Sequence, residues 1–335
     1  MSAAGGHFTT ESASGPRGEP VSAPIGIVPL ANIPETARAH LALGYAGATH
    51  HADVAIIEMA SVSGLALLAT SDRDPWLASS IGTGELIRRA ADFKVAAVLL
   101  GVGGSATHDL GLGALAALGM GCESAAGTPV HPPIPGRWRE IERFRGRMDS
   151  RLPPIRIACD VTNPLLGPNG AAATYGPQKG LRPEDLSRLD HESARLALML
   201  CNHCAQSDAL METPGAGAAG GIAFGLMTAA GARLLPGFQL VSAWLNLETR
   251  LAEADLVITG EGRFDASSLR GKGPGAVAAR ALALGKQVHV FAGAAREVPA
   301  TPALQVHAIS PPGLPLASAL AEAPQHLARA LAEAF

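Results

Sequence analysis

A glycine-rich segment at residues 101–109 constrains the fold of this chain more than any other stretch. It follows an uninterrupted apolar run at residues 95–100, which has the length of a buried strand. It precedes a run of small residues at 112–118 that predicts a helix. Strand, glycine loop and helix in this order place free backbone N–H groups at a helix N-terminus, where anions bind. The alternative is a tight turn in which Asp109 only caps the helix.

The same succession of apolar and helical runs recurs along the chain. Further buried strands are predicted at residues 53–59, 155–161, 256–259, 288–292 and 304–309. Helices are predicted at residues 34–47, 82–93, 183–200, 244–251 and 316–334. This alternation indicates parallel sheets with helices on their faces. Residues 1–30 are predicted to be extended or loop. Residues 123–153, rich in proline and arginine, are predicted to form a long surface excursion.

The composition limits the class of protein. With 335 residues the chain is long enough for two domains, and 47% hydrophobic against 16% charged residues exclude a largely disordered chain. The net charge of −3 comes without a basic stripe, which argues against a nucleic-acid partner. No apolar run is long enough to span a membrane. The four cysteines form no disulfide framework and residues 1–24 lack a signal-peptide pattern, so we expect a cytoplasmic protein.

Asp160 and Asn163 follow a predicted buried strand. Ligands of α/β sheets gather at the carboxyl ends of strands. A carboxylate in that position can bind Mg²⁺ or accept the proton of a substrate hydroxyl. The alternative is an Asx turn before Pro164.

Two further loops contain groups that suit an anion. Lys179 lies between turn residues and can neutralise a phosphate, although a solvated turn lysine is the simpler interpretation. The glycine-rich stretch at residues 214–221 can cradle an anion with its backbone, or it can serve only for close helix packing.

Two acids, an arginine and a lysine follow the predicted strand at residues 256–259. They are Glu261, Arg263, Asp265 and Lys272. Such a set suits the binding of a metal ion and a phosphate, whereas a solvated charged loop is the alternative.

Glycine loops, acids at strand ends and isolated lysines, without a nucleophilic triad, together favour phosphoryl transfer from a nucleotide. That reaction needs positioned charge more than covalent catalysis. The motifs also resemble those of the bacterial glycerate kinase family, in the family's order. They are residues 57–60 with 63–65, 82–87, 103–107, 158–165, 175–180, 214–221 and 257–263. The resemblance covers about residues 10 to 295.

The resemblance implies a kinase, a phosphotransferase with an alcohol group as acceptor, that uses ATP and Mg²⁺. It implies D-glycerate as substrate and 2-phosphoglycerate as product, with 3-phosphoglycerate as the alternative. The implied fold is α/β with two domains, a Rossmann-like parallel-sheet domain formed from both chain ends and an inserted mixed α/β domain. We assign residues 1–19 to an extended N-terminal segment, 20–236 to the inserted domain and 237–335 to the C-terminal part of the Rossmann-like domain.

Residue roles follow from residue type and position at strand ends. The expected catalytic residues are Asp160, Lys179, Glu261, Arg263 and Asp265, with Asp160 and Glu261 as the ligands of Mg²⁺. The expected substrate- and phosphate-binding residues are Gly103, Gly104, Ser105, Thr107, Asn163, Gln178, Gly215, Gly217, Gly220 and Lys272.

The chain departs from the family pattern at several points. We expect the family's N-terminal segment to be absent, because Met1 falls just beyond where it should end. The Rossmann-like sheet would then be incomplete, and its open edge predicts self-association into a homo-oligomer. His108 and Leu110 stand where the family usually has Asn and Gly, and Ser267 where it usually has Gln.

These departures keep a second hypothesis open, a truncated and catalytically impaired relative that only binds an anionic ligand. A third hypothesis, a dinucleotide oxidoreductase, requires an acid at the end of a second strand about 20 residues after the first loop. Glu123 lies near that distance, but the sequence predicts no strand before it, so this hypothesis is disfavoured.

Overall fold

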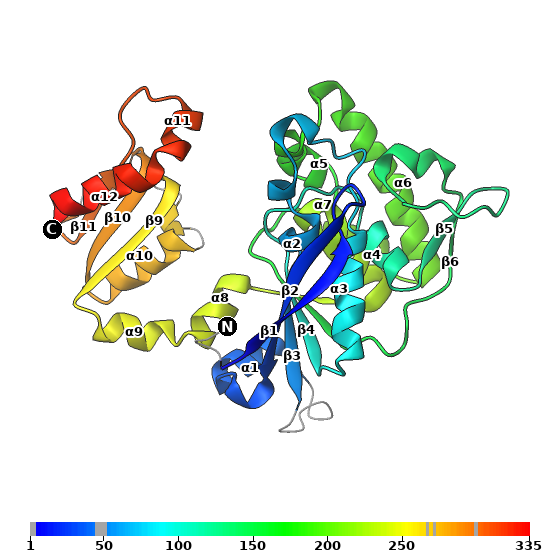
Figure 1. Ribbon diagram of the computed structural model, residues 1–335, viewed down its shortest axis with the longest axis horizontal. Coiled ribbons are helices and arrows are strands. Elements are labelled where there is room, and N and C mark those ends of the chain that lie inside the picture. The colour runs from blue at the N-terminus through cyan, green and yellow to red at the C-terminus, as the bar shows by residue number, and fades with distance from the viewer. Residues whose placement is uncertain (1–4, 44–51, 266–267, 271–272, 298–300) are drawn as a thin grey trace. The chain divides into compact units, whose positions relative to one another are not determined.

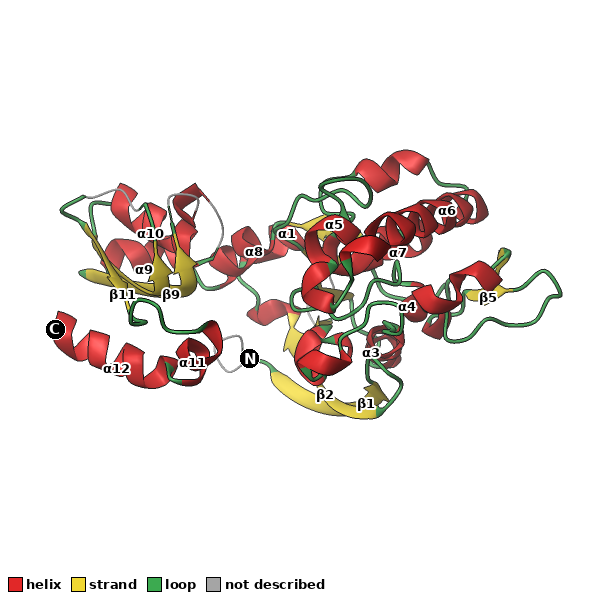
Figure 2. Ribbon diagram, turned by 90° about the horizontal axis from the view of Figure 1, so that it is seen from above, coloured by secondary structure: helices red, strands yellow, loops and turns green. Residues whose placement is uncertain are grey.

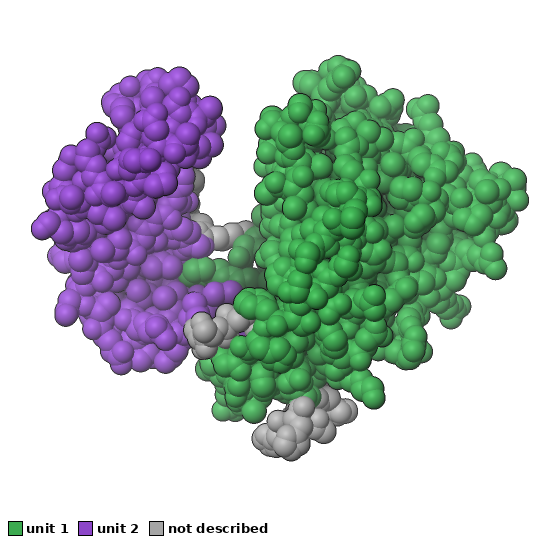
Figure 3. Space-filling view, viewed as in Figure 1, with its two compact units in different colours: residues 1–240 green, residues 241–335 purple. Residues whose placement is uncertain are grey.

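The computed structural model describes residues 5–43, 52–265, 268–270, 273–297 and 301–335 (Figure 1). The chain forms two compact units, Met1–Leu240 and Val241–Phe335, and the boundary falls inside α8 (Gly237–Trp244) (Figure 3). Each unit has its own sheet and its own hydrophobic core. The assignment of the chain to an N-terminal segment, an inserted domain and part of a Rossmann-like domain stays a prediction.

The sheet of the first unit has six strands within the described residues, in the order β1-β2-β3-β4-β7-β8. Their bounds are β1 (His7–Ser14), β2 (Pro20–Pro29), β3 (Asp53–Glu58), β4 (Ala97–Gly101), β7 (Ile155–Ala158) and β8 (Arg233–Leu235). β1 and β2 form an antiparallel hairpin, β2 pairs antiparallel with β3, and the last four strands are parallel. The prediction of extended or loop structure is thus confirmed for residues 5–29, and residues 1–4 lie outside the described residues.

The helices of the first unit surround this sheet. Their bounds are α1 (Glu35–Leu41), α2 (Ala60–Ser63), α3 (Ile81–Asp92), α4 (Leu112–Ala117), α5 (Ala171–Tyr175), α6 (Leu186–Cys204) and α7 (Ala218–Ala230). Ile57, Leu100 and Ile157, on three neighbouring strands, are fully buried in the core beneath them. Glu85 fixes α3 to the end of β1, because its carboxylate accepts hydrogen bonds from the Ser14 N–H (2.7 Å) and hydroxyl (3.1 Å).

Residues 123–153 do not form a mere surface excursion, so that prediction is wrong. The segment continues a hairpin between β5 (Gly121–Glu123) and β6 (Arg143–Arg145), and it contains a 3₁₀ helix, Pro135–Glu140. Trp138 and Ile141 are fully buried in the core, and the Trp138 indole donates to the Pro133 carbonyl at 3.1 Å. Short turns bury side chains without a helical or strand period, so periodicity could not detect them.

The second unit has a parallel three-stranded sheet in the order β11-β10-β9 within the described residues. Its elements are α9 (Leu247–Glu253), β9 (Leu256–Phe264), α10 (Pro274–Ala283), β10 (Gln287–Ala295), β11 (Leu304–Ala308), α11 (Leu316–Ala321) and α12 (Ala323–Ala334). Figure 2 shows α10 on one face of this sheet and α12 on the other. The predicted α/β class is confirmed. No described helix is long and apolar enough to cross a membrane.

Strand β9 is longer than predicted. The sequence suggested a loop after Thr259, but Gly260, Glu261 and Arg263 all pair with β10. A Cβ at Gly260 would lie 2.5 Å from the carbonyl oxygen of Phe291, so this glycine permits close approach between strands and makes no turn.

Candidate active site

The carboxyl ends of β3, β4 and β7 lie side by side in the first unit. Glu58 is the register partner of Gly101, and Gly101 is also the partner of Ala158. The loops that follow these strands therefore begin at one edge of the sheet. This edge is where parallel α/β sheets bind their ligands.

A cavity of about 350 Å³ opens at this edge. Its lining residues come from the loops after β4 and β7, from the segment after α5 and from the start of α7. They are Val102, Gly103, Gly104, Ser105, Ala158, Cys159, Asp160, Val161, Tyr175, Gln178, Lys179, Ala218 and Ala219. The cavity thus brings together six of the residues that the sequence predicted for the site. Its volume is at the small end of the roughly 300–1,000 Å³ of typical ligand sites.

The glycine loop offers unused backbone donors on this cavity. The N–H groups of Gly103, Gly104 and Ser105 donate no hydrogen bond to any described residue. The carbonyl side of the loop is fixed instead, because the Leu65 N–H donates to the Gly104 carbonyl at 2.8 Å. Gly104 has φ +67°, a conformation that L side chains rarely adopt. Consecutive free N–H groups in such a turn suit an anionic ligand.

Lys179 ends a one-turn helix, Pro177–Lys179, and its side chain is buried, with 1% exposure. Its ammonium donates to the Ser105 hydroxyl oxygen at 2.9 Å and to the Thr107 carbonyl at 2.7 Å. Burial lowers the pKa of Lys179 to about 7, and the negative charge of Asp109 opposes this shift. The simpler interpretation as a solvated turn lysine is therefore wrong.

Asp109 lies behind the loop and does not line the cavity. It is fully buried, and its carboxylate accepts hydrogen bonds from the N–H groups of Gly111 (3.1 Å) and Gly113 (3.2 Å) at the start of α4. Burial raises the pKa of Asp109, and the hydrogen bonds it accepts partly counteract that rise. The helix-capping role is thus real, and it coexists with free donors earlier in the same loop.

His108 is a buried neutral histidine beside this cluster. The Ser193 hydroxyl donates to the Leu189 carbonyl (2.7 Å), so its oxygen accepts the hydrogen of His108 Nε2 (3.2 Å). His108 Nδ1 and Thr107 Oγ1 are buried without a hydrogen-bond partner among the described residues. Burial lowers the pKa of His108 to about 3, and the charge of Lys179 acts in the same direction. The sequence marked His108 only as a departure from the family.

Asp160 supplies the carboxylate of the cavity. Both of its oxygens accept from the Phe238 N–H, at 3.1 and 3.0 Å, near the beginning of α8. The positive end of a helix favours a carboxylate at such a position. Its orientation is therefore fixed while it faces the cavity edge.

Asn163 holds the site together from outside the cavity. Its side-chain oxygen accepts the Tyr175 hydroxyl hydrogen at 2.7 Å, and its carbonyl accepts from the N–H groups of Gly215 (3.2 Å) and Gly217 (3.1 Å). Asn163, Gly215 and Gly217 thus bind one another, although all three were predicted to bind substrate. Sequence reasoning missed Tyr175 as a lining residue, and the available signal was its place in the same motif as Gln178.

The second glycine stretch packs against the first. Gly220 has φ +70°, and a Cβ there would lie 2.2 Å from the Thr107 carbonyl oxygen. The Gly220 carbonyl accepts from the Leu110 N–H at 3.1 Å. Close packing is therefore the role of Gly220 itself, while Ala218 and Ala219 reach the cavity wall.

The remaining predicted residues lie in the second unit. Arg263 pairs with Asp265 at 3.6 Å between Nε and Oδ2, and the Arg263 side chain is 66% exposed. One carboxylate oxygen of Glu261, Oε1, is buried without a hydrogen-bond partner among the described residues. Lys272 lies outside the described residues. Within the part of the chain that the structure describes, no three His, Cys, Asp or Glu side chains cluster as a metal site.

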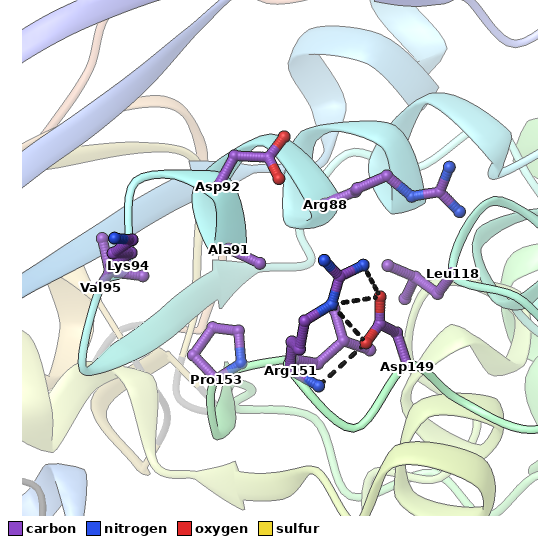
Figure 4. Close-up of a pocket in the computed structure, with 10 residues that line it drawn as sticks. Arg88, Ala91, Asp92, Lys94, Val95, Leu118, Asp149, Arg151 and Pro153 are labelled. Atoms are coloured by element: carbon purple, nitrogen blue, oxygen red, sulfur yellow. Dashed lines mark hydrogen bonds and ion pairs between the residues drawn. The ribbon is translucent and has the colours of Figure 1, made fainter.

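A larger cavity, of about 690 Å³, lies at the other end of β4 (Figure 4). Arg88, Asp92, Lys94 and the Arg151–Asp149 ion pair surround it. It contains none of the predicted site residues, and it lies by the N-terminal end of a parallel strand. We therefore place the candidate active site at the smaller cavity.

The fold and this cavity define an α/β protein with an anion-binding loop and a carboxylate at the carboxyl edge of its sheet. Comparison with known proteins identifies the family. The model of the glycerate kinase family matches residues 1–335, and this chain belongs to that family.

Individual relatives agree with this assignment. The chain is 43% identical over 245 residues to a glycerate kinase of Haemophilus influenzae, covering 72% of this chain and 64% of the relative. It is 41% identical over 241 residues to the glycerate 2-kinase of Escherichia coli, covering 71% and 63%. The chain thus spans slightly less than two thirds of these curated relatives. A crystal structure of "putative glycerate kinase 2" from Salmonella typhimurium LT2 matches 97% of this chain and 80% of its own, with a TM-score of 0.68 and 36% identity.

Proposed function

We propose that this protein transfers the terminal phosphoryl group of ATP to a hydroxyl group of D-glycerate. The proposed product is 2-phosphoglycerate, with 3-phosphoglycerate as the alternative. The observation that carries the proposal is one cavity that combines the Asp160 carboxylate with the N–H groups of Gly103 and Gly104, which donate to no described residue. The N–H groups can hold an anionic group, and the carboxylate can accept the proton of a hydroxyl. Family membership supports D-glycerate as the proposed substrate.

In this reaction a bond forms between the substrate oxygen and phosphorus, and the bond between phosphorus and the ADP oxygen breaks. We assign Asp160 the role of accepting the hydroxyl proton, with binding of a magnesium ion as its alternative role. Gly103, Gly104 and Ser105 hold a charged group of the substrate or of the transferred phosphate. Arg263 and Lys272 are proposed to neutralise phosphate, and Asp265 to orient substrate.

We propose that carboxylates of the chain hold a magnesium ion. An ion that arrives with nucleotide phosphates usually takes only one or two carboxylates from the protein. Asp160 and Glu261 are the proposed ligands, and Glu261 Oε1 has no hydrogen-bond partner among the described residues, which supports a ligand role. When bound, Mg²⁺ would offset the charge of the phosphates.

The test is an assay of ADP release by the 335-residue chain with ATP, Mg²⁺ and D-glycerate, with the phosphorylated position identified by NMR. Asp160→Asn should lower kcat by about a hundredfold or more, the usual contribution of a general base, while the unfolding midpoint stays unchanged. Asp149→Asn, in the larger cavity, is the matched control and should keep full activity. Normal turnover of Asp160→Asn would remove this residue from the active site. Binding of D-glycerate without turnover in the wild type would favour the impaired relative.

We also propose self-association and a cytoplasmic location. β9 is an outer strand of the three-stranded sheet, and Leu256 and Ile258 on it are exposed. Such an edge pairs readily with another chain. Light scattering that gives the mass of one chain, 34.1 kDa, at every concentration would contradict self-association. No disulfide joins the four described cysteines, which is usual for thiols in the cytoplasm.

A further inference from the structure

The contact between Lys179 and Ser105 determines the direction of the Ser105 hydroxyl. An ammonium group has donors and no acceptor, so the Ser105 oxygen must accept the 2.9 Å hydrogen bond from Lys179. The Ser105 hydrogen then points elsewhere, and no described residue accepts it. Ser105 lines the cavity, so this hydrogen is available to a ligand there.

Lys179 itself is poorly placed to meet a ligand. Its side chain is 1% exposed, and both of its hydrogen bonds go to the loop, to Ser105 and to the Thr107 carbonyl. Lys179 therefore acts on a ligand in the cavity through the Ser105 hydroxyl, which it holds in place. This differs from the direct neutralisation of phosphate that the sequence suggested.

We propose that Lys179 is a positioning residue, which fixes the Ser105 hydroxyl as a hydrogen-bond donor to the anionic group of the ligand. This inference rests on the proposed function, because it takes the anion to be a carboxylate or phosphate of the kinase substrates. The Gly103 and Gly104 N–H groups and the Ser105 hydroxyl then form one set of donors on a single loop.

The arrangement depends on the charge of Lys179. A neutral amine can accept the Ser105 hydrogen, which would withdraw it from the cavity. The titratable groups that act on Lys179 are Asp109, which favours the ammonium, and His108, whose pKa near 3 keeps it uncharged in a neutral buffer. As the pH rises through about 7, Lys179 loses its proton and no longer holds the Ser105 hydroxyl as a donor toward the cavity.

The experiment is a double-mutant cycle on the full chain, with calorimetric titration of inorganic sulfate, whose charge does not change over the pH range used. Ser105→Ala and Lys179→Met should each weaken sulfate binding by about tenfold to a hundredfold, the loss expected for one hydrogen bond to a charged group. The double variant should bind no more weakly than the weaker single variant. Lys94→Met, a change at an exposed lysine of the same unit, is the control and should bind normally.

Two further readouts separate positioning from a general structural effect. Wild-type affinity should fall as the pH rises through about 7, and both Ser105→Ala and Lys179→Met should lose this dependence. Ser105→Thr keeps the hydroxyl and should restore most of the affinity. If Lys179→Met does not fold, the pH profile of Ser105→Ala still decides the question.

The outcomes distinguish this inference from the proposed reaction. Three outcomes would each overturn the positioning role. The first is a double variant whose loss of sulfate affinity is the product of the two single losses. The others are a Ser105→Ala variant that keeps the wild-type pH dependence of sulfate affinity, and a wild type that does not bind sulfate. Non-additive sulfate binding without turnover of ATP and D-glycerate would uphold the positioning role and reject the proposed reaction.

Discussion

The carboxylate of Asp109 accepts two hydrogen bonds from Ser80, one from its N–H and one from its hydroxyl, both at 2.8 Å. The Ser80 oxygen in turn accepts from the Ala114 N–H at 3.0 Å. Ser80 directly precedes α3, and Ala114 lies in α4. One buried pair therefore fixes the end of the glycine loop to the beginnings of two helices.

Removal of the Ser80 hydroxyl should destabilise the first unit. Ser80→Ala leaves the Ala114 N–H unpaired and deprives Asp109 of a donor, and a buried unsatisfied group costs about 1–3 kcal/mol. Unfolding in urea should show this loss. Ser71→Ala removes an exposed serine hydroxyl that hydrogen-bonds an aspartate, Asp72, and should change the free energy of unfolding by less than about 0.5 kcal/mol. Equal stability of the two variants would show that the Ser80–Asp109 pair is not a structural anchor.

Lys179 should make the protein more stable as the pH rises from about 7 to 10.5. Its pKa is lowered in the folded state, so the unfolded chain binds more protons over this window, and stability rises with pH. The effect is about 1.4 kcal/mol for each unit of pKa difference. Lys179→Met should remove this rise, because methionine does not titrate. Denaturant unfolding of the wild type and of Lys179→Met at the two ends of the window measures the change in the free energy of unfolding. The same change in both proteins would contradict the burial of a titrating lysine.

His108 should contribute to instability in acid. Its folded-state pKa is about 3, against 6.5 for an ordinary histidine, so the unfolded chain binds more protons between these values and stability falls on acidification. His108→Asn should shift acid unfolding to lower pH. His191→Asn, at an exposed histidine of α6, should not. The raised pKa of Asp109 acts oppositely and is common to all three proteins, so their comparison isolates His108.

Leu110 should tolerate glycine better than alanine. Its φ is +55°, in the region that favours glycine, although the side chain is fully buried. Both substitutions lose about 2–5 kcal/mol of packing, but only glycine also relieves a backbone strain of roughly 1–2 kcal/mol. The midpoint of thermal unfolding should therefore be higher for Leu110→Gly than for Leu110→Ala. At Leu115, buried in α4, the order should be reversed. The same order at both positions would exclude strain at Leu110.

Local patterns predicted much of the framework. The unbroken apolar runs around Val98 and Ile57 correctly indicated β4 and β3, because a strand buried on both faces needs no polar alternation. The glycine stretch after Thr259 misled, because glycine serves a turn and a close strand contact equally well. Only the pairing with β10, which the sequence does not state, distinguishes the two.

The candidate site was predicted in its residue types but not in its contacts. Strand ends correctly marked Ser105 and Asp160 as neighbours of one edge. The burial of Lys179 could not be predicted, since it depends on a one-turn helix packing against a loop 74 residues earlier in the chain. The contacts of Asn163 with Tyr175 and with the loop at residues 214–221 could not be predicted either, and its binding of substrate stays a prediction.

The burial of Lys179 also affects chemical labelling. The chain holds four lysines, Lys94, Lys179, Lys272 and Lys286. An amine-directed acylating reagent should react with Lys94 and Lys286 on the folded protein much faster than with Lys179, which is 1% exposed and hydrogen-bonded to the loop. The acylation of Lys179, followed by mass spectrometry, would therefore count the molecules whose first unit has opened. One lysine that the proposed chemistry depends on would then serve as a built-in reporter of local unfolding.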